Sequence, residues 1–313
     1  MTPGGESGRR VGRFTDIRHL EATDSTNADV AALARTGAPE GVVVVTRYQR
    51  AGRGRRGRIW TAPAGSALLA SVLLRPVLVP SVAPLVGLAA GVAAVEACAD
   101  VAGVFPSLKW PNDVVVETPS GTGTVAPAAG TQSGTAIGTG TGKLAGLLAE
   151  SLVEGDRLAA VVVGMGCNLR RVPGPEARIL ERRGGSAVTS VQNGSSPLSP
   201  LSPPPPVPAP PGAAYLEDLA GRSVDRDDLL YAWLARLDRW CTTLEARGGE
   251  HAVAAAYRRH CTTLGELVRV ELADGALQGR AVEVTEQGHL VVATHAGRRV
   301  VAAGDVVHLR QQP

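Results

Sequence analysis

The sequence predicts an α+β protein, in which a mixed sheet with flanking helices is followed by a small antiparallel barrel. Apolar runs bounded by Gly or Pro indicate buried strands, and longer runs with helical spacing indicate helices packed on them. After Cys261 the pattern changes to short alternating strands separated by turn residues such as Asp274 and Gly275. We therefore expect two domains, residues 1–262 and residues 263–313.

The first domain is expected to alternate between strands and helices. Strands are predicted at residues 42–46, 67–74, 114–117, 144–152 and 158–167. Helices are predicted at residues 81–102, 227–246 and 250–261, with a further helix that starts after Ser25 or Thr26 and ends at Arg35. The second domain is predicted to contain strands at residues 267–272, 277–285, 290–294, 298–302 and 306–309.

Two uncharged segments interrupt this pattern. Residues 118–142 consist of Gly, Thr, Ser, Ala and Pro with other small or apolar residues, and residues 184–214 include four consecutive prolines. Such compositions bury too little apolar surface to offset the entropy of ordering the chain. We expect a flexible loop at the first segment and a linker-like insertion at the second.

Charge, apolar runs and cysteine spacing together exclude several classes of protein. The 313 residues include 32 Lys plus Arg and 29 Asp plus Glu, so the net charge of +3 does not suit a surface that binds nucleic acid throughout. No run of 18 uninterrupted apolar residues is present, and residues 1–15 lack the apolar core of a secretory signal. Four widely spaced cysteines do not suggest a disulfide framework or a zinc site. We expect a cytoplasmic protein that does not bind membranes.

A dense arginine segment follows the strand predicted at residues 42–46. Five arginines lie at positions 50, 53, 55, 56 and 58, and the intervening glycines match G-x-G-x-x-G. A dinucleotide-binding fingerprint opens a helix and is followed by an acidic residue about 20 positions later. Here a strand follows, and the next acidic residue is Glu96. Three interpretations stay open: a loop that binds a polyanion, a solvated basic loop, and a nucleic-acid patch.

Lys143 lies where the first uncharged segment meets a predicted strand. The preceding Gly-Thr-Gly resembles a phosphate-binding loop, but position 137 is Ile and position 144 is Leu, where that motif requires Gly and Ser or Thr. This excludes the phosphate-binding loop. Lys143 then has two interpretations, a surface lysine at a strand edge or an ammonium group aimed into a site by the strand.

Five short motifs in order along the chain resemble one family. They are Asp-Ser-Thr-Asn at 24–27, Gly-Arg-Gly-Arg-Arg-Gly-Arg at 52–58, Lys-Trp-Pro-Asn-Asp at 109–113, Lys-Leu-Ala-Gly at 143–146 and Gly-Met-Gly-Cys-Asn at 164–168. This combination resembles biotin protein ligases of the type without an N-terminal DNA-binding domain. Only 23 residues precede Asp24, whereas that domain needs roughly sixty, so we expect no repressor function by that route. Lipoate ligases and a nucleic-acid-binding protein that uses residues 50–58 are the alternatives.

The resemblance implies a fold, a reaction and partners. The fold is a catalytic domain like that of class II synthetases, with an SH3-like barrel at the C-terminus. The reaction forms biotinyl-5′-adenylate from biotin and ATP with Mg²⁺, then passes biotin to a lysine of a biotin carboxyl carrier domain. Neither nucleic acid nor a membrane is expected as a partner, and the protein is expected to be a monomer or a weak homodimer.

The resemblance also assigns site residues. The predicted biotin contacts are Ser25, Thr26, Asn27, Gln49, Gly52, Arg53, Arg55, Lys143 and Gly146. The predicted ATP contacts are Arg55, Arg58, Trp60, Lys109, Asn112, Lys143 and Asn168. The predicted catalytic residues are Lys143, Arg55, Arg53 and Asp113, and Asp113 is also the candidate Mg²⁺ ligand.

Several of these residues have structural alternatives. Ser25 or Thr26 suits the cap of the helix that ends at Arg35, and Asp29 imitates the acidic partner of a capping box. Capping is compatible with a place in the pocket. Trp60 and Trp110 are both candidates for core aromatics, and we favour the core for Trp110. Asp113 suits the cap of a turn as well as a catalytic role.

Overall fold

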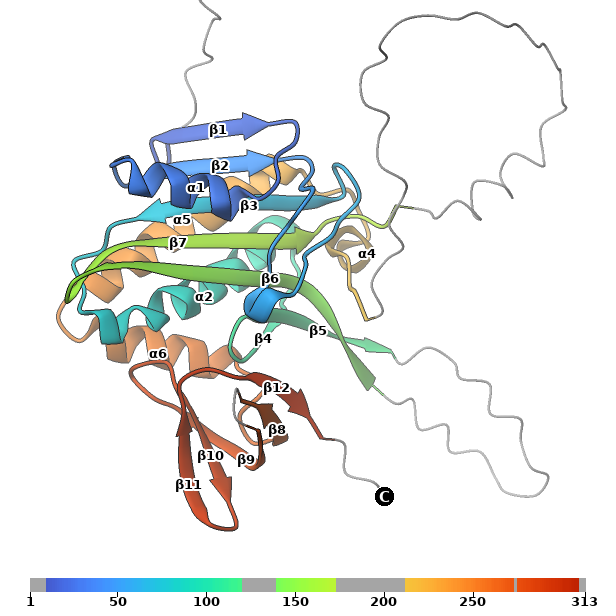
Figure 1. Ribbon diagram of the computed structural model, residues 1–313. Coiled ribbons are helices and arrows are strands. Elements are labelled where there is room, and N and C mark those ends of the chain that lie inside the picture. The colour runs from blue at the N-terminus through green and yellow to red at the C-terminus, as the bar shows by residue number, and fades with distance from the viewer. Residues whose placement is uncertain (1–9, 120–138, 173–211, 273–274, 310–313) are drawn as a thin grey trace, which may run out of the picture.

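The computed structural model describes residues 10–119, 139–172, 212–272 and 275–309, and its main element is a seven-stranded mixed sheet (Figure 1). The strand order is β1-β2-β3-β7-β6-β5-β4. The strands are β1 (Asp16–Leu20), β2 (Val42–Thr46), β3 (Ala67–Leu74), β4 (Ser107–Lys109), β5 (Asp113–Pro119), β6 (Thr139–Glu154) and β7 (Arg157–Asn168). β1 pairs with β2 in parallel, and the other neighbours in this sheet are antiparallel.

Helices cover both faces of this sheet. α1 (Thr26–Arg35) packs on one face, while α2 (Pro84–Ala102), α5 (Arg226–Glu245) and α6 (Gly249–His260) lie on the other (Figure 1). β2 shows why both faces need cover, because all five of its residues are buried. Val42 and Val44 pack with Val30 of α1, whereas Val43 and Val45 join the core formed with α2. Successive strand side chains point to opposite faces, so a continuous valine run suits a sheet buried on both sides.

α2 is the central helix of the core. An 18-residue window within residues 80–102 has a mean hydropathy of 1.9, which is apolar enough for a membrane span, but 72% of that window is buried inside the protein. The helix predicted at residues 81–102 begins at Pro84, after a 3₁₀ turn at Pro80–Val82. Proline suits the first turn because its missing amide would have no partner there. The helix ends before Gly103, which has a φ of 66°.

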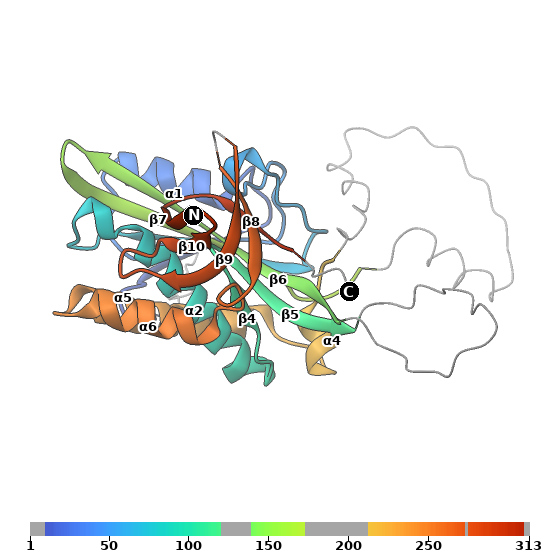
Figure 2. The same cartoon turned by 90° about the horizontal axis from the view of Figure 1, so that it is seen from below.

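A five-stranded antiparallel sheet follows α6. Its strands are β8 (Leu267–Glu271), β9 (Ala276–Val284), β10 (Leu290–Thr294), β11 (Gly297–Val301) and β12 (Asp305–His308), in the order β11-β10-β9-β8-β12. Figure 2 shows this sheet against the first domain. The indole nitrogen of Trp110 donates to the Gly288 carbonyl at 3.0 Å, and Gly288 faces Leu85 and Leu88 of α2. The two sheets therefore share one continuous hydrophobic core.

The observed elements match most of the predicted ones, with shifted ends. The predicted loop at residues 118–142 is too long, because residues 118–119 belong to β5 and residues 139–142 to β6. The backbone pairing between these strands continues as far as Pro119 and Thr139, which extends both strands into the small-residue segment. The rest of that loop, residues 120–138, lies outside the described residues.

The second predicted insertion also needs a correction at its end. Within residues 184–214, the described part begins at Gly212. The Lys143 amide donates to the Gly212 carbonyl at 2.7 Å, and the Ala214 amide donates to the Lys143 carbonyl at 2.9 Å. These bonds fix residues 212–214 beside β6. They lead into α4 (Leu216–Ala220), a short helix that the sequence analysis did not predict.

Candidate functional site

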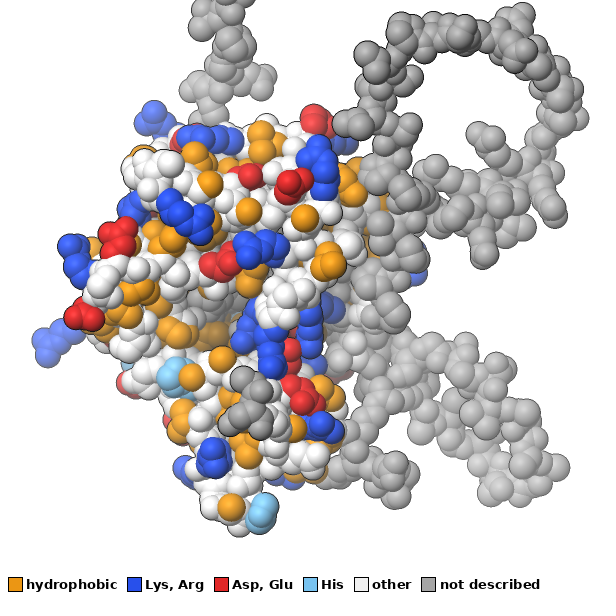
Figure 3. All heavy atoms as spheres, in the orientation of Figure 1, with side chains coloured by type: hydrophobic (Ala, Val, Ile, Leu, Met, Phe, Trp, Pro, Cys, Tyr) orange, Lys and Arg blue, Asp and Glu red, His pale blue; other side chains and the backbone are white. Residues whose placement is uncertain are grey.

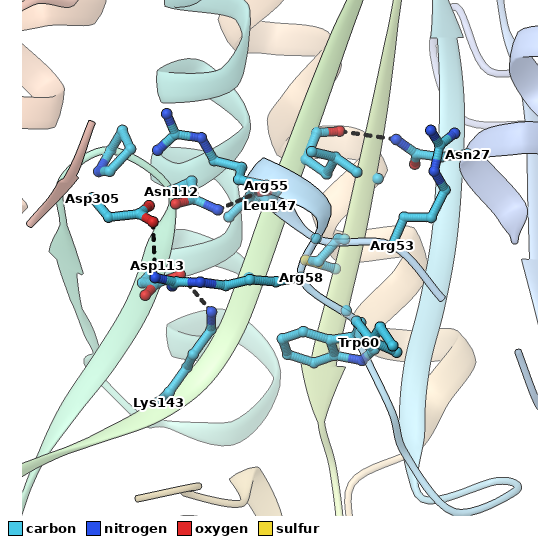
Figure 4. Close-up of a pocket in the computed structure, with 18 of the residues that line it drawn as sticks. Asn27, Arg53, Arg55, Arg58, Trp60, Asn112, Asp113, Lys143, Leu147 and Asp305 are labelled. Carbon is cyan, nitrogen blue, oxygen red and sulfur yellow. Dashed lines mark hydrogen bonds and ion pairs between the residues drawn. The ribbon is translucent and has the colours of Figure 1, made fainter. Parts of the chain in front are cut away.

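A cavity of about 320 Å³ lies where the first sheet, the arginine segment and the second sheet meet. Most residues predicted for the site line this cavity. They are Ser25, Thr26, Asn27, Gln49, Arg53, Arg55, Arg58, Trp60, Lys109, Asn112, Asp113, Lys143 and Gly146. Figure 4 shows several of them projecting from α1, from the arginine segment and from neighbouring strands toward a common centre. Residues far apart in sequence are thus brought to one site.

One end of the cavity is uncharged and hydrogen-bonded, and we call it the polar end; Ser25, Thr26, Asn27 and Gln49 line it, and the buried Ser71 supports them. The Thr26 amide donates to Oε1 of Gln49 at 2.8 Å. The Ser71 hydroxyl lies 2.7 Å from the Thr26 hydroxyl and donates to Oδ1 of Asn27 at 2.6 Å. Ser25, Thr26, Asn27 and Ser71 are each at most 4% exposed. Their mutual hydrogen bonds fix the side chains before any ligand contacts them.

Asn27 is the most constrained side chain of the polar end. Its Nδ2 donates to the Leu148 carbonyl at 3.2 Å and to Oε2 of Glu150 at 2.8 Å. A Cβ at position 164 of β7 would lie 2.0 Å from Oδ1 of Asn27, so glycine is required there. The Gly-Met-Gly segment of β7 therefore leaves room for the asparagine side chain.

The capping hypothesis is confirmed for Ser25. Its hydroxyl oxygen accepts from the Ala28 amide at 3.5 Å at the start of α1, while the residue also lines the cavity. The predicted resemblance to a capping box is wrong. Asp29 accepts from the Thr23 hydroxyl at 2.6 Å, so its carboxylate faces back along the chain, away from the Thr26 amide.

Trp60 forms a flat wall between the two ends of the cavity. A Cβ at Gly166 would lie 2.5 Å from the indole, and one at Gly146 would lie 3.0 Å from it, so both glycines allow close approach of the ring. Nζ of Lys143 lies 5.4 Å from the ring centroid. Trp110, by contrast, is 2% exposed and packs in the core, which confirms the interpretation favoured for it.

The other end of the cavity is charged, and we call it the charged end, formed by Lys109, Asp113, Lys143, Arg58 and Asp305. Nζ of Lys143 lies 2.6 Å from Oδ1 of Asp113, and Nη2 of Arg58 lies 2.8 Å from Oδ2 of Asp305 (Figure 4). Burial lowers the pKa of Lys109 below its ordinary value; Asp113 opposes this shift, while Lys143 adds to it. Figure 3 shows basic side chains gathered with acidic ones on this part of the surface.

The arginine segment is held by the second sheet. Nη1 of Arg55 donates to the Gly304 carbonyl at 3.2 Å, and burial lowers the pKa of this guanidinium. Arg56, whose φ is +54°, donates to the carbonyls of Glu271 and Leu272 at 2.8 and 3.1 Å.

The two remaining arginines of the segment pair with carboxylates. Arg50 lies 3.4 Å from Asp24, and Arg53 lies 3.7 Å from Glu150. With Arg58 on Asp305, all five arginines have partners within the protein. The segment is therefore folded against the protein, while the side chains of Arg50, Arg53 and Arg58 stay 53%, 54% and 69% exposed.

Two predicted residues lie outside the cavity wall. Gly52 lines an adjacent hollow under the arginine segment, and a Cβ there would lie 2.3 Å from the Trp60 carbonyl oxygen. Asn168 is 8% exposed, and its Nδ2 donates to the carbonyls of Lys143 and Ala214 at 3.2 Å each. Asn168 thus fastens the chain at Ala214 to β6 beside Lys143.

Four polar residues at or directly behind the site are not predicted from the sequence: Ser71, Glu150, Glu271 and Asp305. Ser71 lies within an apolar run, so it was taken as an ordinary strand residue. Asp305 follows Gly304 in the second sheet, nearly 250 residues after the arginines that it faces. The glycine before it was visible as a turn signal, but its contact with the arginine segment depends on how the two sheets pack.

Among the described residues, no group of three or more His, Cys, Asp or Glu side chains is placed to hold a metal ion. Mg²⁺ commonly binds through substrate phosphates and one or two carboxylates, and Asp113 is within the cavity for such a role. Its carboxylate is paired with Lys143, so a role as metal ligand stays a prediction.

The fold and the site together define a class of protein. A buried, uncharged pocket joined to a cluster of Lys and Arg suits an enzyme that holds a small molecule by its neutral head and activates its acidic group with a nucleotide. The Biotin/lipoate A/B protein ligase family matches residues 20–168, and the Biotin protein ligase C terminal domain matches residues 263–309.

Comparison with individual proteins gives the family directly. The chain is 34% identical to the biotin--[acetyl-CoA-carboxylase] ligase of Mycobacterium tuberculosis over 96% of its own length and 92% of that protein. It is 25% identical to the bifunctional ligase/repressor BirA of Bacillus subtilis, over 96% and 78%. The biotin protein ligase of Aquifex aeolicus, solved with biotin and ATP, shares the fold with a TM-score of 0.64 and 23% identity, over 95% of this chain and all of that one. The chain belongs to the biotin protein ligase family.

Proposed function

We propose that this protein forms biotinyl-5′-adenylate from biotin and ATP and transfers the biotinyl group to a lysine of the biotin carboxyl carrier domain of an acetyl-CoA carboxylase. The activity for which the Mycobacterium tuberculosis relative is named supports this reaction. The observation that carries it here is the continuity of one cavity from the polar end to the charged end, with Lys143 beside the wall formed by Trp60. A second protein must reach the same cavity for the transfer.

The first step joins two anions. A carboxylate is already ionised at pH 7, so its oxygen attacks the α-phosphate without a general base, and the bond between that phosphorus and the pyrophosphate oxygen breaks. Lys143 is placed to neutralise the carboxylate and the α-phosphate. Lys109 and Arg58 are placed to stabilise the charge that develops on pyrophosphate, because they line the same end of the cavity.

The second step consumes the adenylate. A lysine amine attacks the carboxyl carbon, an amide bond forms, and the bond from that carbon to the phosphate oxygen breaks, which releases AMP. A lysine with an ordinary pKa of about 10.4 must lose a proton before it attacks. Asp113 is a carboxylate of the charged end, where it pairs with Lys143. When Lys143 pairs with the phosphate instead, the Asp113 carboxylate is able to accept the proton of the incoming lysine.

The polar end favours biotin over lipoate. The ring system of biotin includes a ureido group with two N–H donors and one carbonyl acceptor, and we assign its contacts to Ser25, Thr26 and Gln49, which line the cavity and carry hydroxyl and amide groups. The dithiolane of lipoate offers neither. Burying it there would displace water from the polar side chains that line the cavity and would give no hydrogen bond in return.

The remaining expectations are part of the proposal. The partners of all five arginines support a ligand-binding loop more than a nucleic-acid patch. We also propose that the protein works in the cytoplasm, without nucleic acid or membrane, as a monomer or weak homodimer.

Biotin-dependent exchange of pyrophosphate into ATP tests the first step. The purified protein should catalyse this exchange with biotin and at least about 100-fold less well with lipoate, the discrimination that unpaired buried polar groups impose. Absence of exchange with both acids would refute the proposed function. Binding to DNA that weakens steeply with salt would favour the nucleic-acid alternative.

A further inference from the structure

Glu150 of β6 connects two parts of the site that the reaction needs to coordinate. Its Oε2 accepts from Nδ2 of Asn27 at 2.8 Å, and its Oε1 lies 3.7 Å from Nη1 of Arg53. Asn27 is at the polar end, and Arg53 is in the arginine segment. The two oxygens of one carboxylate therefore contact two different elements. Figure 4 shows Asn27 and Arg53 on the same side of the cavity.

These contacts belong to a network of hydrogen bonds and one ion pair that starts and ends next to the arginine segment. Gln49 directly precedes the arginine segment, and its Oε1 accepts from the Thr26 amide. Thr26 contacts Ser71, and Ser71 donates to Asn27. Asn27 donates to Glu150, which pairs with Arg53, four residues after Gln49. The network therefore contacts the chain at Gln49, directly before the segment, and again at Arg53 within it. The start of the loop is thereby tied to the polar end at two points.

Burial along this network decreases from the residues of the polar end to Arg53 in the arginine segment. Asn27 and Ser71 are 4% and 0% exposed, whereas the side chains of Glu150 and Arg53 are 35% and 54% exposed. Glu150 is thus the link between a rigid, buried network and a loop at the surface. Its neighbour Leu148 supplies a second acceptor to Asn27, so the asparagine stays bonded if Glu150 is changed. The link to Arg53 has no such alternative acceptor among the contacts of the described residues.

We infer that Glu150 is a positioning residue that couples the arginine segment to the polar end by holding Arg53 in place. The inference rests on the proposed function. Asn27 holds one oxygen of the Glu150 carboxylate, and the other oxygen holds Arg53 beside the cavity. The same carboxylate that orients the asparagine thus also sets the position of the loop.

Two substitutions separate the charge from the hydrogen bond. Glu150→Gln keeps an acceptor for Asn27 and removes the charge that faces Arg53, whereas Glu150→Ala removes both. Glu154→Gln is the matched control, because Glu154 lies exposed near the end of the same strand. All three proteins are compared for thermal unfolding first, and Glu150→Gln is the decisive variant if Glu150→Ala unfolds.

Limited trypsin digestion measures the loop without using the reaction. Cleavage after residues 53–58, located by mass spectrometry, should be about two to five times faster in Glu150→Gln than in wild type, as expected for a partly exposed ion pair. Glu154→Gln should match wild type. Equal cleavage in Glu150→Gln and wild type would overturn the inference, whether or not the protein proves to be a biotin ligase.

Kinetics then test the coupling itself. In Glu150→Gln the KM for biotin should stay within about twofold of wild type, while free biotinyl-adenylate released into solution rises about two- to fivefold, because the loop and not the polar end has been loosened. Arg53→Gln combined with Glu150→Gln should release no more adenylate than the stronger single variant. Additive effects of the two substitutions would show that the residues act separately and would refute the coupling.

Discussion

The two ends of the cavity are built on opposite principles. At the polar end, Thr26, Asn27 and Ser71 are almost fully buried and satisfy one another by short hydrogen bonds. At the charged end, the side chains of Lys143 and Asp113 are 39% and 26% exposed and are held as ion pairs. Neutral groups form a rigid template because their bonds need not change when a ligand binds. Charged groups must exchange their protein partners for phosphates, so this end has to rearrange.

The charged end gives the largest expected effect. Lys143→Ala should lower biotin-dependent pyrophosphate exchange by at least about 100-fold, because a cation facing the α-phosphate is lost. Biotin binding measured by calorimetry should fall far less, since the polar end is untouched. Exchange within about threefold of wild type would show that the charge of Lys143 is not used in the first step.

The polar end can be broken by one methyl group. Gly164→Ala places a Cβ 2.0 Å from Oδ1 of Asn27, so the asparagine must move and its bonds to Ser71 and Glu150 are disturbed. We expect biotin affinity to fall about 10- to 100-fold, the range of overpacking penalties. ATP affinity, measured on the same sample, should change less than about threefold because the charged end is unaltered. A comparable loss of both affinities would mean that the two ends are not independent.

The arginine segment contacts both ends, through Arg53 and Arg58, and should show an intermediate effect. Arg55→Gly removes the hydrogen bond to Gly304 that fixes the segment on the second sheet. Free biotinyl-adenylate in quenched reactions should rise about tenfold, the value of a lost charged hydrogen bond. Arg50→Gly is the control, because Arg50 belongs to the same segment, pairs with the exposed Asp24 and does not line the cavity. Equal release by the two variants would argue against a closing role for Arg55.

Much of the fold was predictable because its strands are local and apolar. The valine run of β2 and the alternating pattern of the second sheet each identify a strand without reference to the rest of the chain. β1 was missed because only two of its five residues, Ile17 and Leu20, are apolar, and β4 has only three residues. β1 exists because its backbone pairs with β2 in parallel, a contact between residues 26 positions apart.

Site residues that belong to short motifs were predictable from the sequence. Site residues that come from distant segments without a motif were not. Lys143, Asn112 and Trp60 were predicted by resemblance, and the structure places them around one cavity. Asp305 and Glu150 have no distinctive neighbours in the sequence, and their importance follows from their contacts with Arg58 and Arg53. For Asn168 the motif predicted a nucleotide contact, whereas the structure adds a role that the motif did not predict: its side chain donates to two backbone carbonyls.

The smallest effect tests how the charged end exchanges its partners. Burial lowers the pKa of Lys109 below the ordinary lysine value, and the cation Lys143 adds to this shift. A bound phosphate favours the charged amine and raises that pKa again, so binding takes up protons when the pH lies near or above the lowered pKa. ATP affinity should therefore fall as pH rises through this range. Calorimetry in two buffers of different ionisation enthalpy, repeated at several pH values from 7 up to the ordinary lysine pKa of about 10.4, should detect proton uptake in wild type. Lys109→Arg, which stays charged, should lose this uptake while it still binds ATP. The same proton uptake in the variant would place the titrating group elsewhere and would show that the charged end binds phosphate without recharging Lys109.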